Sequence, residues 1–176
     1  MECPVCEVRK FERTVLDGDL NAFKCGECGG HWVNSFQYWL WKDALPQNIE
    51  EIACSGTYEV QDVIATKECP ECGNLLQRYH VGHGTSFTID RCEKCRGIWL
   101  DKNEWEILRE KNLHDDIHFI FSQQWQKQAR DEKLELSKEA MFEKYIGKDG
   151  VAKLKEFKAW YKSQKEQSMI LAYLNN

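Results

Sequence analysis

Cysteine pairs of the form Cys-x-x-Cys are the residues of this chain best suited to do chemistry. Four such pairs hold eight of the nine cysteines: Cys3 with Cys6, Cys25 with Cys28, Cys69 with Cys72, and Cys92 with Cys95. The two sulfurs of such a turn can reach one ion, so two turns supply the four thiolates of a closed tetrahedral site. The pattern predicts two metal sites that stabilise folding, because neither leaves a coordination position open for a substrate.

The cysteine signal is part of a longer duplication. Adding 67 to the numbers of four residues gives the same residue type again: Cys25, Cys28, Gly30 and Trp32 become Cys92, Cys95, Gly97 and Trp99. The two halves have nearly the same spacing, with 18 and 19 residues between the second and third cysteines. This similarity favours ligation within each half over a crossed arrangement.

Each half predicts a β-hairpin followed by a short helix. In the first half, residues 9–16 and 20–24 flank an Asp-Gly-Asp turn; in the second, residues 75–79 and 87–90 repeat the hairpin. Asn34 with Gln37, and Asp101 with Glu104, have the spacing of helix N-caps and their partners. The fold class that follows is α+β: two small metal-stabilised modules in tandem, then an α-helical region.

The composition divides the chain into four predicted parts. These are a first module at 1–48, an acidic connector at 49–66, a second module at 67–112 and a helical C-terminal region at 113–176. A brief helix from Pro46 toward Cys54 and a strand over residues 58–64 are expected in the connector. Cys54 is the unpaired ninth cysteine and has no activating base beside it in the sequence, which favours an inert small apolar residue over a nucleophile.

The second module resembles the prokaryotic zinc-ribbon family named after the zinc ribbon of transcription factor IIB (zf-TFIIB). The resemblance lies in the C-P-x-C pair at residues 69–72 and in the C-x-x-C-x-G-x-W-L-D run at residues 92–101. The first module departs from it, with Val33 and Asn34 where the family has Leu and Asp. The resemblance implies two structural zinc ions on the eight paired cysteines, and a nucleic-acid-binding or transcription-related role.

The C-terminal region shows helical periodicity. Apolar residues predict an amphipathic helix over 113–134, a second helix from Ser137 to Gly147, a third from about Asp149, and a last turn or two after Ser168. Four lysines fall within roughly 80° of one another on the third helix; they are Lys155, Lys158, Lys162 and Lys165. This stripe is either a solvated face or, together with Arg91, Lys94 and Arg96, a surface for nucleic acid.

Aromatic residues of the first module form the other candidate surface. Phe36, Tyr38, Trp39 and Trp41 crowd one short predicted helix. They either pack against the other parts of the chain or bind a partner protein.

Histidines offer weaker alternatives. His31 could replace a cysteine as ligand, but its counterpart is Ile98. His80 and His83 lie at a predicted loop tip without acidic or cysteine companions, which favours solvated residues. His114 and His118 superficially resemble a zinc-protease helix, yet Asp stands where the catalytic Glu would be, and we expect no enzyme.

Charge and hydropathy argue against several classes of protein, namely non-specific nucleic-acid binders, secreted proteins and membrane proteins. The formal net charge is −5, and no segment is strongly basic, which weakens non-specific nucleic-acid binding. A ligand candidate at residue 3 argues against a cleavable leader, and no apolar run approaches the roughly 18 residues that span a bilayer. We expect a cytoplasmic protein with reduced thiols, no membrane contact and no small-molecule substrate.

Three functional hypotheses follow. The first is a non-enzymatic zinc protein whose tandem ribbons bind a macromolecule, either a protein or nucleic acid, in a role that could be related to transcription. The second is a protein-assembly or scaffold role. The third is an iron electron carrier, because C-P-x-C and C-x-x-C-G turns also resemble rubredoxin.

Overall fold

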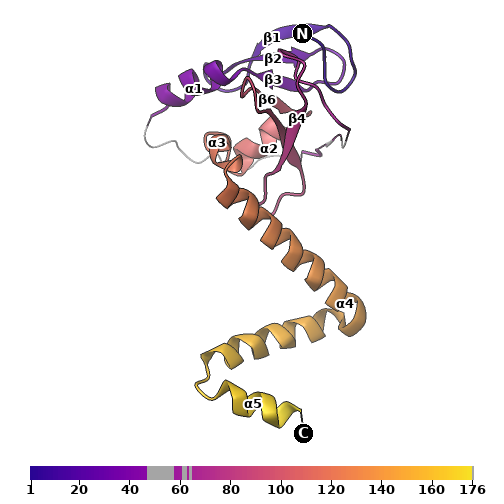
Figure 1. Ribbon diagram of the computed structural model, residues 1–176, viewed down its shortest axis with the longest axis vertical. Helices are drawn as coiled ribbons and strands as arrows, with labels where there is room; N and C mark the ends of the chain where they lie inside the picture. The colour runs from indigo at the N-terminus through magenta and orange to yellow at the C-terminus, as the bar shows by residue number, and fades with distance from the viewer. Residues whose placement is uncertain (47–57, 61–62, 64, 176) are drawn as a thin grey trace. The chain divides into compact units, whose positions relative to one another are not determined.

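The protein is described by a computed structural model that covers residues 1–46, 58–60, 63 and 65–175 (Figure 1). The chain divides into two compact units, Met1–Arg130 and Asp131–Asn176. The predicted helix from Pro46 toward Cys54 lies outside the described residues, apart from Pro46 itself, which is not in a helix. Of the predicted strand over 58–64, the described residues 58–60 and 63 are not in a strand.

The first unit is built on one antiparallel sheet of six strands in the order β1-β2-β3-β6-β5-β4. The strands are β1 Phe11–Val15, β2 Asn21–Cys25, β3 His31–Val33, β4 Leu76–His80, β5 Thr88–Cys92 and β6 Ile98–Leu100. Both predicted hairpins are confirmed, as β1 with β2 and β4 with β5. Sequence reasoning did not predict β3 and β6, since three residues are too few to show a strand alternation.

These two short strands join the duplicated halves. β3 pairs antiparallel with β6 at the middle of the sheet, and Trp32 lies opposite Trp99. The register Val33↔Ile98 and His31↔Leu100 completes the match. The two hairpins therefore extend outward from a shared centre, and the first unit has one sheet instead of two.

Side-chain alternation along the strands gives the sheet two different faces. On one face, Trp32 and Trp99 pack among the eight paired cysteines in a single buried cluster. On the other face, Val33, Ile98 and Leu100 pack against helical residues in the larger core. One layer thus contains both metal-binding groups, and the opposite layer holds most of the apolar volume.

Three short helices cover the second face: α1 Ser35–Ala44, α2 Glu104–Glu110 and α3 Ile117–Ile120. Asn34 is the N-cap of α1, as predicted, and its side chain accepts a 2.8 Å hydrogen bond from the backbone N–H of Phe36. Gln37 does not complete the cap; its Oε1 instead accepts from the side-chain amide of Asn21. Trp41 of α1 contacts Trp105 of α2, with ring centroids 5.9 Å apart.

The predicted helix over 113–134 is wrong in its first half. Leu113 precedes α3, and α4 begins only at Gln123. The interruption allows Gln126 to bind three backbone groups, because its side chain accepts from His80 N–H and donates to the carbonyls of His80 and Ile120. Leu113, Ile117 and Ile120 are buried as the apolar pattern indicated, but from a bent segment.

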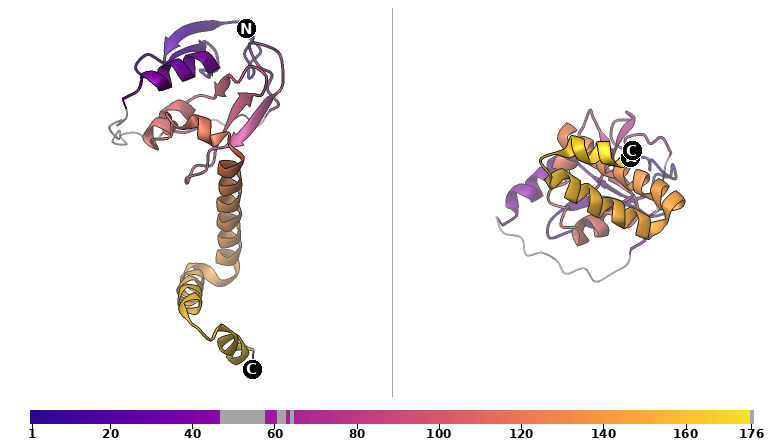
Figure 2. Two further views of the ribbon diagram at one scale, coloured as in Figure 1. Left: turned by 60° about the vertical axis from the view of Figure 1, so that its left-hand side comes forward. Right: turned by 90° about the horizontal axis from the view of Figure 1, so that it is seen from below.

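Helix α4 spans Gln123–Ser163 and leaves helical geometry at Gly147, where φ is 73° and ψ is 167°. The second unit comprises its later part and α5 Gln167–Leu174. The break predicted at Gly147 is present, whereas none occurs at Ser137, whose hydroxyl donates to the Lys133 carbonyl at 2.9 Å. Figure 2 shows the bend within α4 from two further sides. Among the described residues, no helix combines the length and apolar content needed to cross a membrane.

Candidate metal centres

All four Cys-x-x-Cys turns share one backbone geometry. In each turn, the backbone carbonyl of the first cysteine (residue i) accepts a hydrogen bond from the backbone N–H of residue i+4. The backbone N–H of the same cysteine donates to the carbonyl of residue i+5. The eight donor–acceptor distances are 2.7–3.1 Å. The residue that closes each turn has positive φ: Glu7 at 59°, Gly29 at 75°, Gly73 at 70° and Arg96 at 62°. Two of these are glycines, for which this conformation costs little, and two are not.

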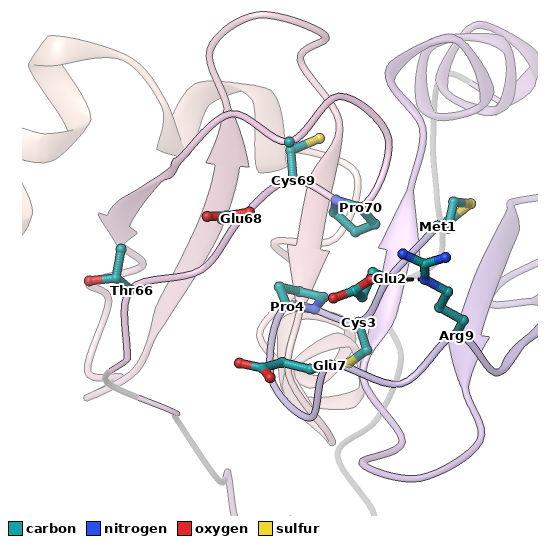
Figure 3. Close-up of a pocket in the computed structure, with 11 residues that line it drawn as sticks. Met1, Glu2, Cys3, Pro4, Glu7, Arg9, Thr66, Glu68, Cys69 and Pro70 are labelled. Atoms are coloured by element: carbon teal, nitrogen blue, oxygen red, sulfur yellow. Dashed lines mark hydrogen bonds and ion pairs between the residues drawn. The ribbon is translucent and has the colours of Figure 1, made fainter.

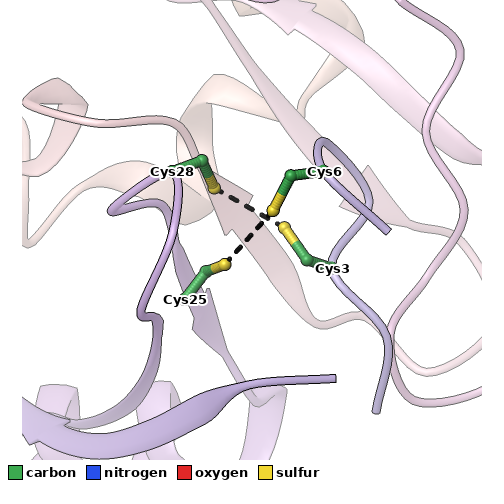
Figure 4. A group of neighbouring side chains, drawn as sticks. All are labelled: Cys3, Cys6, Cys25 and Cys28. Atoms are coloured by element: carbon green, nitrogen blue, oxygen red, sulfur yellow. Dashed lines mark hydrogen bonds between the residues drawn. The ribbon is translucent and has the colours of Figure 1, made fainter. Parts of the chain in front are cut away.

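The turns bring the eight cysteines together in two groups of four (Figure 4 shows the first). One group contains Cys3, Cys6, Cys25 and Cys28, and the other contains Cys69, Cys72, Cys92 and Cys95. Within each group all Sγ atoms lie within 4.8 Å of one another, so each site is assembled within one half of the duplication.

The sulfur geometry fits a tetrahedral thiolate site. Two Sγ···Sγ distances in each group are 3.5 Å. Zinc–sulfur bonds of about 2.3 Å place tetrahedral sulfurs roughly 3.8 Å apart, whereas a disulfide needs about 2.05 Å. Each ribbon therefore carries a four-cysteine site able to hold a zinc ion, with no disulfide among these eight thiols.

Burial raises the pKa of the cysteine thiols, whereas hydrogen bonds from backbone N–H groups lower it. Burial raises the pKa of Cys28 and of Cys95 to about 11 and raises that of Cys3 and Cys69 further. The backbone N–H and the side-chain amide of Asn74 donate to Cys72 Sγ and lower the pKa of that thiol to about 6. Backbone N–H groups of the turns also favour the thiolate form at the buried cysteines, as a metal ligand requires.

The histidines considered as alternative ligands belong to neither four-cysteine group. His31 is buried on β3, and burial together with Lys24 lowers its pKa to about 4. His114 lies 3.5 Å from Asp17 and against Trp41, while His118 Nδ1 is 2.9 Å from the Tyr38 hydroxyl. Across the described part of the chain, the two cysteine groups are the only clusters of three or more metal-binding side chains. Cys54 lies outside the described residues.

The repeated Gly-x-Trp signal has a reciprocal structural meaning. Trp99 packs on Gly30 of the first ribbon, and Trp32 packs on Gly97 of the second. A Cβ at Gly30 would lie 2.3 Å from Trp99 Cζ2, and one at Gly97 would lie 2.2 Å from Trp32 Cζ2. Each tryptophan therefore lies in the cluster that contains the paired cysteines and also packs against the backbone of the opposite module.

A buried ionic cluster distinguishes the second ribbon from the first. Lys67 Nζ donates to Asp90 at 2.5 Å and to Asp101 at 2.7 Å, and all three side chains are almost fully buried. Asp101 also accepts from Trp99 Nε1 at 2.7 Å. Burial lowers the pKa of Lys67, but the two carboxylates outweigh it, so the net shift is upward.

This cluster corrects the predicted cap at Asp101. Glu104 does reach back to the backbone N–H of Asp101, at 2.7 Å, but Asn103 is the N-cap residue of α2. The Asp101 carboxylate instead accepts hydrogen bonds from Lys67 Nζ and Trp99 Nε1. Sequence reasoning missed Lys67 because its two partners are 23 and 34 residues away.

An acidic groove of about 740 Å³ separates the two Cys-Pro turns (Figure 3). Pro4 and Pro70 line it from opposite sides, together with Glu7 and Glu68. Glu2 also lines it and is paired with Arg9 at 2.9 Å. Cys3 and Cys69 border the groove, so both metal sites are close to this surface.

The residues predicted to contact a partner differ in their exposure to solvent. Phe36 and Trp39 are 69% and 45% exposed, whereas Tyr38 and Trp41 are buried. Lys94 and Arg96 are exposed, and Arg91 is half-buried over the Phe121 ring at 4.6 Å. All four lysines of the predicted stripe are exposed; they are Lys155, Lys158, Lys162 and Lys165.

Comparison with known proteins identifies both ribbons. Residues 2–44 and 68–111 each match the family model described as transcription factor zinc-finger, a TFIIB-type zinc ribbon. The two matched segments coincide with the two four-cysteine groups. Neither a curated protein nor a solved structure matches the chain.

Proposed function

Because residues 2–44 and 68–111 are two tandem ribbons of the transcription factor zinc-finger family, with a zinc-binding site in each, we propose that this protein is a non-enzymatic binding module whose partner is a protein. Four thiolates complete the coordination of a zinc ion, so the metal would stabilise the fold and activate no substrate. The family description favours a partner in transcription.

The observation that carries this proposal is an exposed aromatic patch on the first unit. Phe36, Trp39 and Leu40 share one face of α1 and are 69%, 45% and 57% exposed. The His118 ring lies 5.1 Å from Trp39 and 4.1 Å from Phe119, which is 51% exposed, so the patch continues onto α3. Contiguous exposed apolar residues mark binding sites, and tryptophan is enriched among residues that dominate binding energy.

Charge favours a protein over nucleic acid for this surface. Residues 1–130 contain 15 Lys and Arg against 21 Asp and Glu, a net charge of −6. Each zinc ion held by four thiolates would add a formal −2. An acidic unit repels phosphates, whereas an aromatic patch binds a protein without them.

A second candidate, nucleic-acid binding, is favoured by one local feature. A groove of about 870 Å³ is lined by Arg78, Lys127 and Arg130. Tyr79 and Phe121 also line it, with ring centroids 5.0 Å apart. Positive charge beside aromatic rings is the arrangement that binds single strands.

One experiment separates the two candidates. The zinc-loaded protein is used as bait in an extract of its native host, with and without nuclease, beside the variant F36A/W39A. We expect a defined protein to be captured after nuclease treatment and to be lost with F36A/W39A. The control V15A alters an exposed apolar residue elsewhere on the first unit and should retain the partner. Capture that nuclease abolishes would favour the basic groove instead.

A further inference from the structure

The helical second unit leaves most of its large apolar side chains open to solvent. Thirteen large apolar side chains between residues 131 and 176 are 37–84% exposed. They are Leu134, Leu136, Met141, Phe142, Tyr145, Ile146, Leu154, Phe157, Trp160, Met169, Leu171, Tyr173 and Leu174. Soluble monomers rarely leave so many large apolar side chains of one small unit exposed, so we infer that a partner covers part of this unit.

Charged residues on the two helical segments of this unit form matching stripes. Glutamates Glu132, Glu135, Glu139 and Glu143 lie three or four residues apart before Gly147, and lysines Lys155, Lys158, Lys162 and Lys165 have similar spacing after it. Each stripe falls within roughly 80° of its helix at 100° per residue. Residues 131–146 carry three lysines against five acids, a net charge of −2; residues 148–166 carry six against three, a net charge of +3.

The structure shows that the two stripes attract each other. Lys155 Nζ lies 2.8 Å from Glu139 Oε2, across the bend at Gly147. Lys138 and, more weakly, Lys158 lower the pKa of Glu135. Within the described residues, Lys158, Lys162 and Lys165 make no ion pair. Most of the basic stripe therefore remains available to a second acidic surface.

We propose that the second unit is a homodimer interface, in which the acidic segment 131–146 of one copy lies against the basic segment 148–166 of another. A two-fold interface is self-complementary: each contact occurs twice, with the roles exchanged. One helical unit carrying both signs on separate segments meets this requirement. The association would cover the apolar side chains that border the stripes, including Leu154 and Phe157 beside the lysines.

Both the amount of exposed apolar surface and the balance of charge favour a second copy of the chain as the partner. A stable interface buries about 800 Å² per partner, and one aromatic side chain buries up to about 150–250 Å². Five of the exposed side chains are aromatic: Phe142, Tyr145, Phe157, Trp160 and Tyr173. A membrane-surface helix has a predominantly basic polar face, whereas this unit holds nine lysines against eight acids.

Complementary charge reversal tests the proposal on the full-length, zinc-loaded chain. The variant E135K/E139K makes both segments basic, and K155E/K158E makes both acidic. Sedimentation velocity should give about twice 20.7 kDa for the parent protein. Each variant alone should sediment as a monomer, because like charges then face each other across the two-fold axis. An equimolar mixture should recover the dimer, since every reversed contact is complementary again.

Controls make the outcome decisive. K144E/K153E changes the charge as much as K155E/K158E does, but on residues opposite the two stripes, and should leave the dimer intact. Circular dichroism and two zinc ions per chain verify that each variant is folded. Repair of the intrachain Glu139–Lys155 pair cannot explain recovery on mixing, because each variant chain carries a single sign at these positions. A monomeric parent protein at about 100 μM, a mixture that stays monomeric, or a monomer that binds phosphatidylserine vesicles would overturn the proposal.

Discussion

The indole of Trp99 lies directly on Gly30 of the opposite ribbon, so that a Cβ at Gly30 would come within 2.3 Å of the ring. Trp32 and Gly97 repeat the relationship in the other direction at 2.2 Å. Both tryptophans are fully buried in the cluster that contains all eight paired cysteines. The glycines and tryptophans that both halves share therefore pack the two zinc ribbons against each other. We expect a substitution that destabilises one ribbon to destabilise the other as well.

Substituting Gly30 with alanine should destabilise the first unit. The added methyl group meets the Trp99 ring and the Leu100 carbonyl, neither of which can move freely. Overpacking of this kind costs about 1–3 kcal/mol in the free energy of unfolding. Urea unfolding followed by tryptophan fluorescence measures the change. At Gly26 a Cβ meets only the flexible Lys10 side chain, so Gly26→Ala is the matched control. Equal losses at both positions would contradict the packing argument.

Loss of one zinc site should weaken both ribbons. Replacing Cys28 with serine removes one sulfur from the first site, and we expect zinc content to fall from two ions per chain toward one. Because Trp32 and Trp99 bridge the sites, the remaining zinc should also leave at a lower chelator concentration. Elemental analysis and a chelator titration measure the two effects. A second site that releases zinc as in the parent protein would show that the ribbons are independent. A metal content that is mostly iron would instead favour an electron carrier.

Local signals in the sequence predicted the metal-binding turns and hairpins but not their assembly. The two Cys-x-x-Cys pairs of each module span 26 or 27 residues of sequence, and the structure has the pairs and the first hairpin at the predicted positions. The β3–β6 pairing joins residues that are 65 to 69 positions apart in the sequence, and no local pattern predicts it. The role of Asp101 was predicted wrongly because only local spacing can be read from a sequence. The three-residue spacing to Glu104 indicated a helix cap, whereas nothing local indicated the contact with Lys67.

Replacing Lys67 with methionine should be strongly destabilising. The change leaves the carboxylates of Asp90 and Asp101 buried without their shared cation. Breaking a buried ion pair from one side costs about 3–5 kcal/mol. Chemical unfolding at pH 7 measures the loss, with zinc content as a check that the sites still form. Lys10→Met removes an exposed ion pair with Glu27 and should change stability by less than about 1 kcal/mol. Similar effects of the two substitutions would refute a role for the buried cluster.

Glycine at position 7 should stabilise the first Cys-Pro turn. Glu7 closes this turn at φ 59°, a conformation that costs a residue with a Cβ about 1 kcal/mol or more. Gly73 occupies the equivalent place in the second ribbon without this cost. Thermal unfolding of zinc-loaded Glu7→Gly should therefore show a higher midpoint than the parent protein. Glu7→Ala removes the same carboxylate but keeps the strain, so a rise in both variants would point to charge instead of backbone conformation.

Acid should destabilise the protein partly through His31. This side chain is 7% exposed, and its burial, assisted by Lys24, lowers its pKa to about 4, below the roughly 6.5 of an unfolded histidine. A depressed histidine pKa means that the unfolded chain binds the proton first. The stabilising effect is therefore complete above about pH 6.5 and is lost as the pH falls toward 4. Between pH 7 and pH 5 the loss should be about 2 kcal/mol. Unfolding measured with excess zinc should show a shallower pH dependence for His31→Leu, which cannot bind that proton. Because both proteins keep the same eight thiols, protonation of the zinc ligands affects them equally, and parallel profiles would mean that His31 does not contribute.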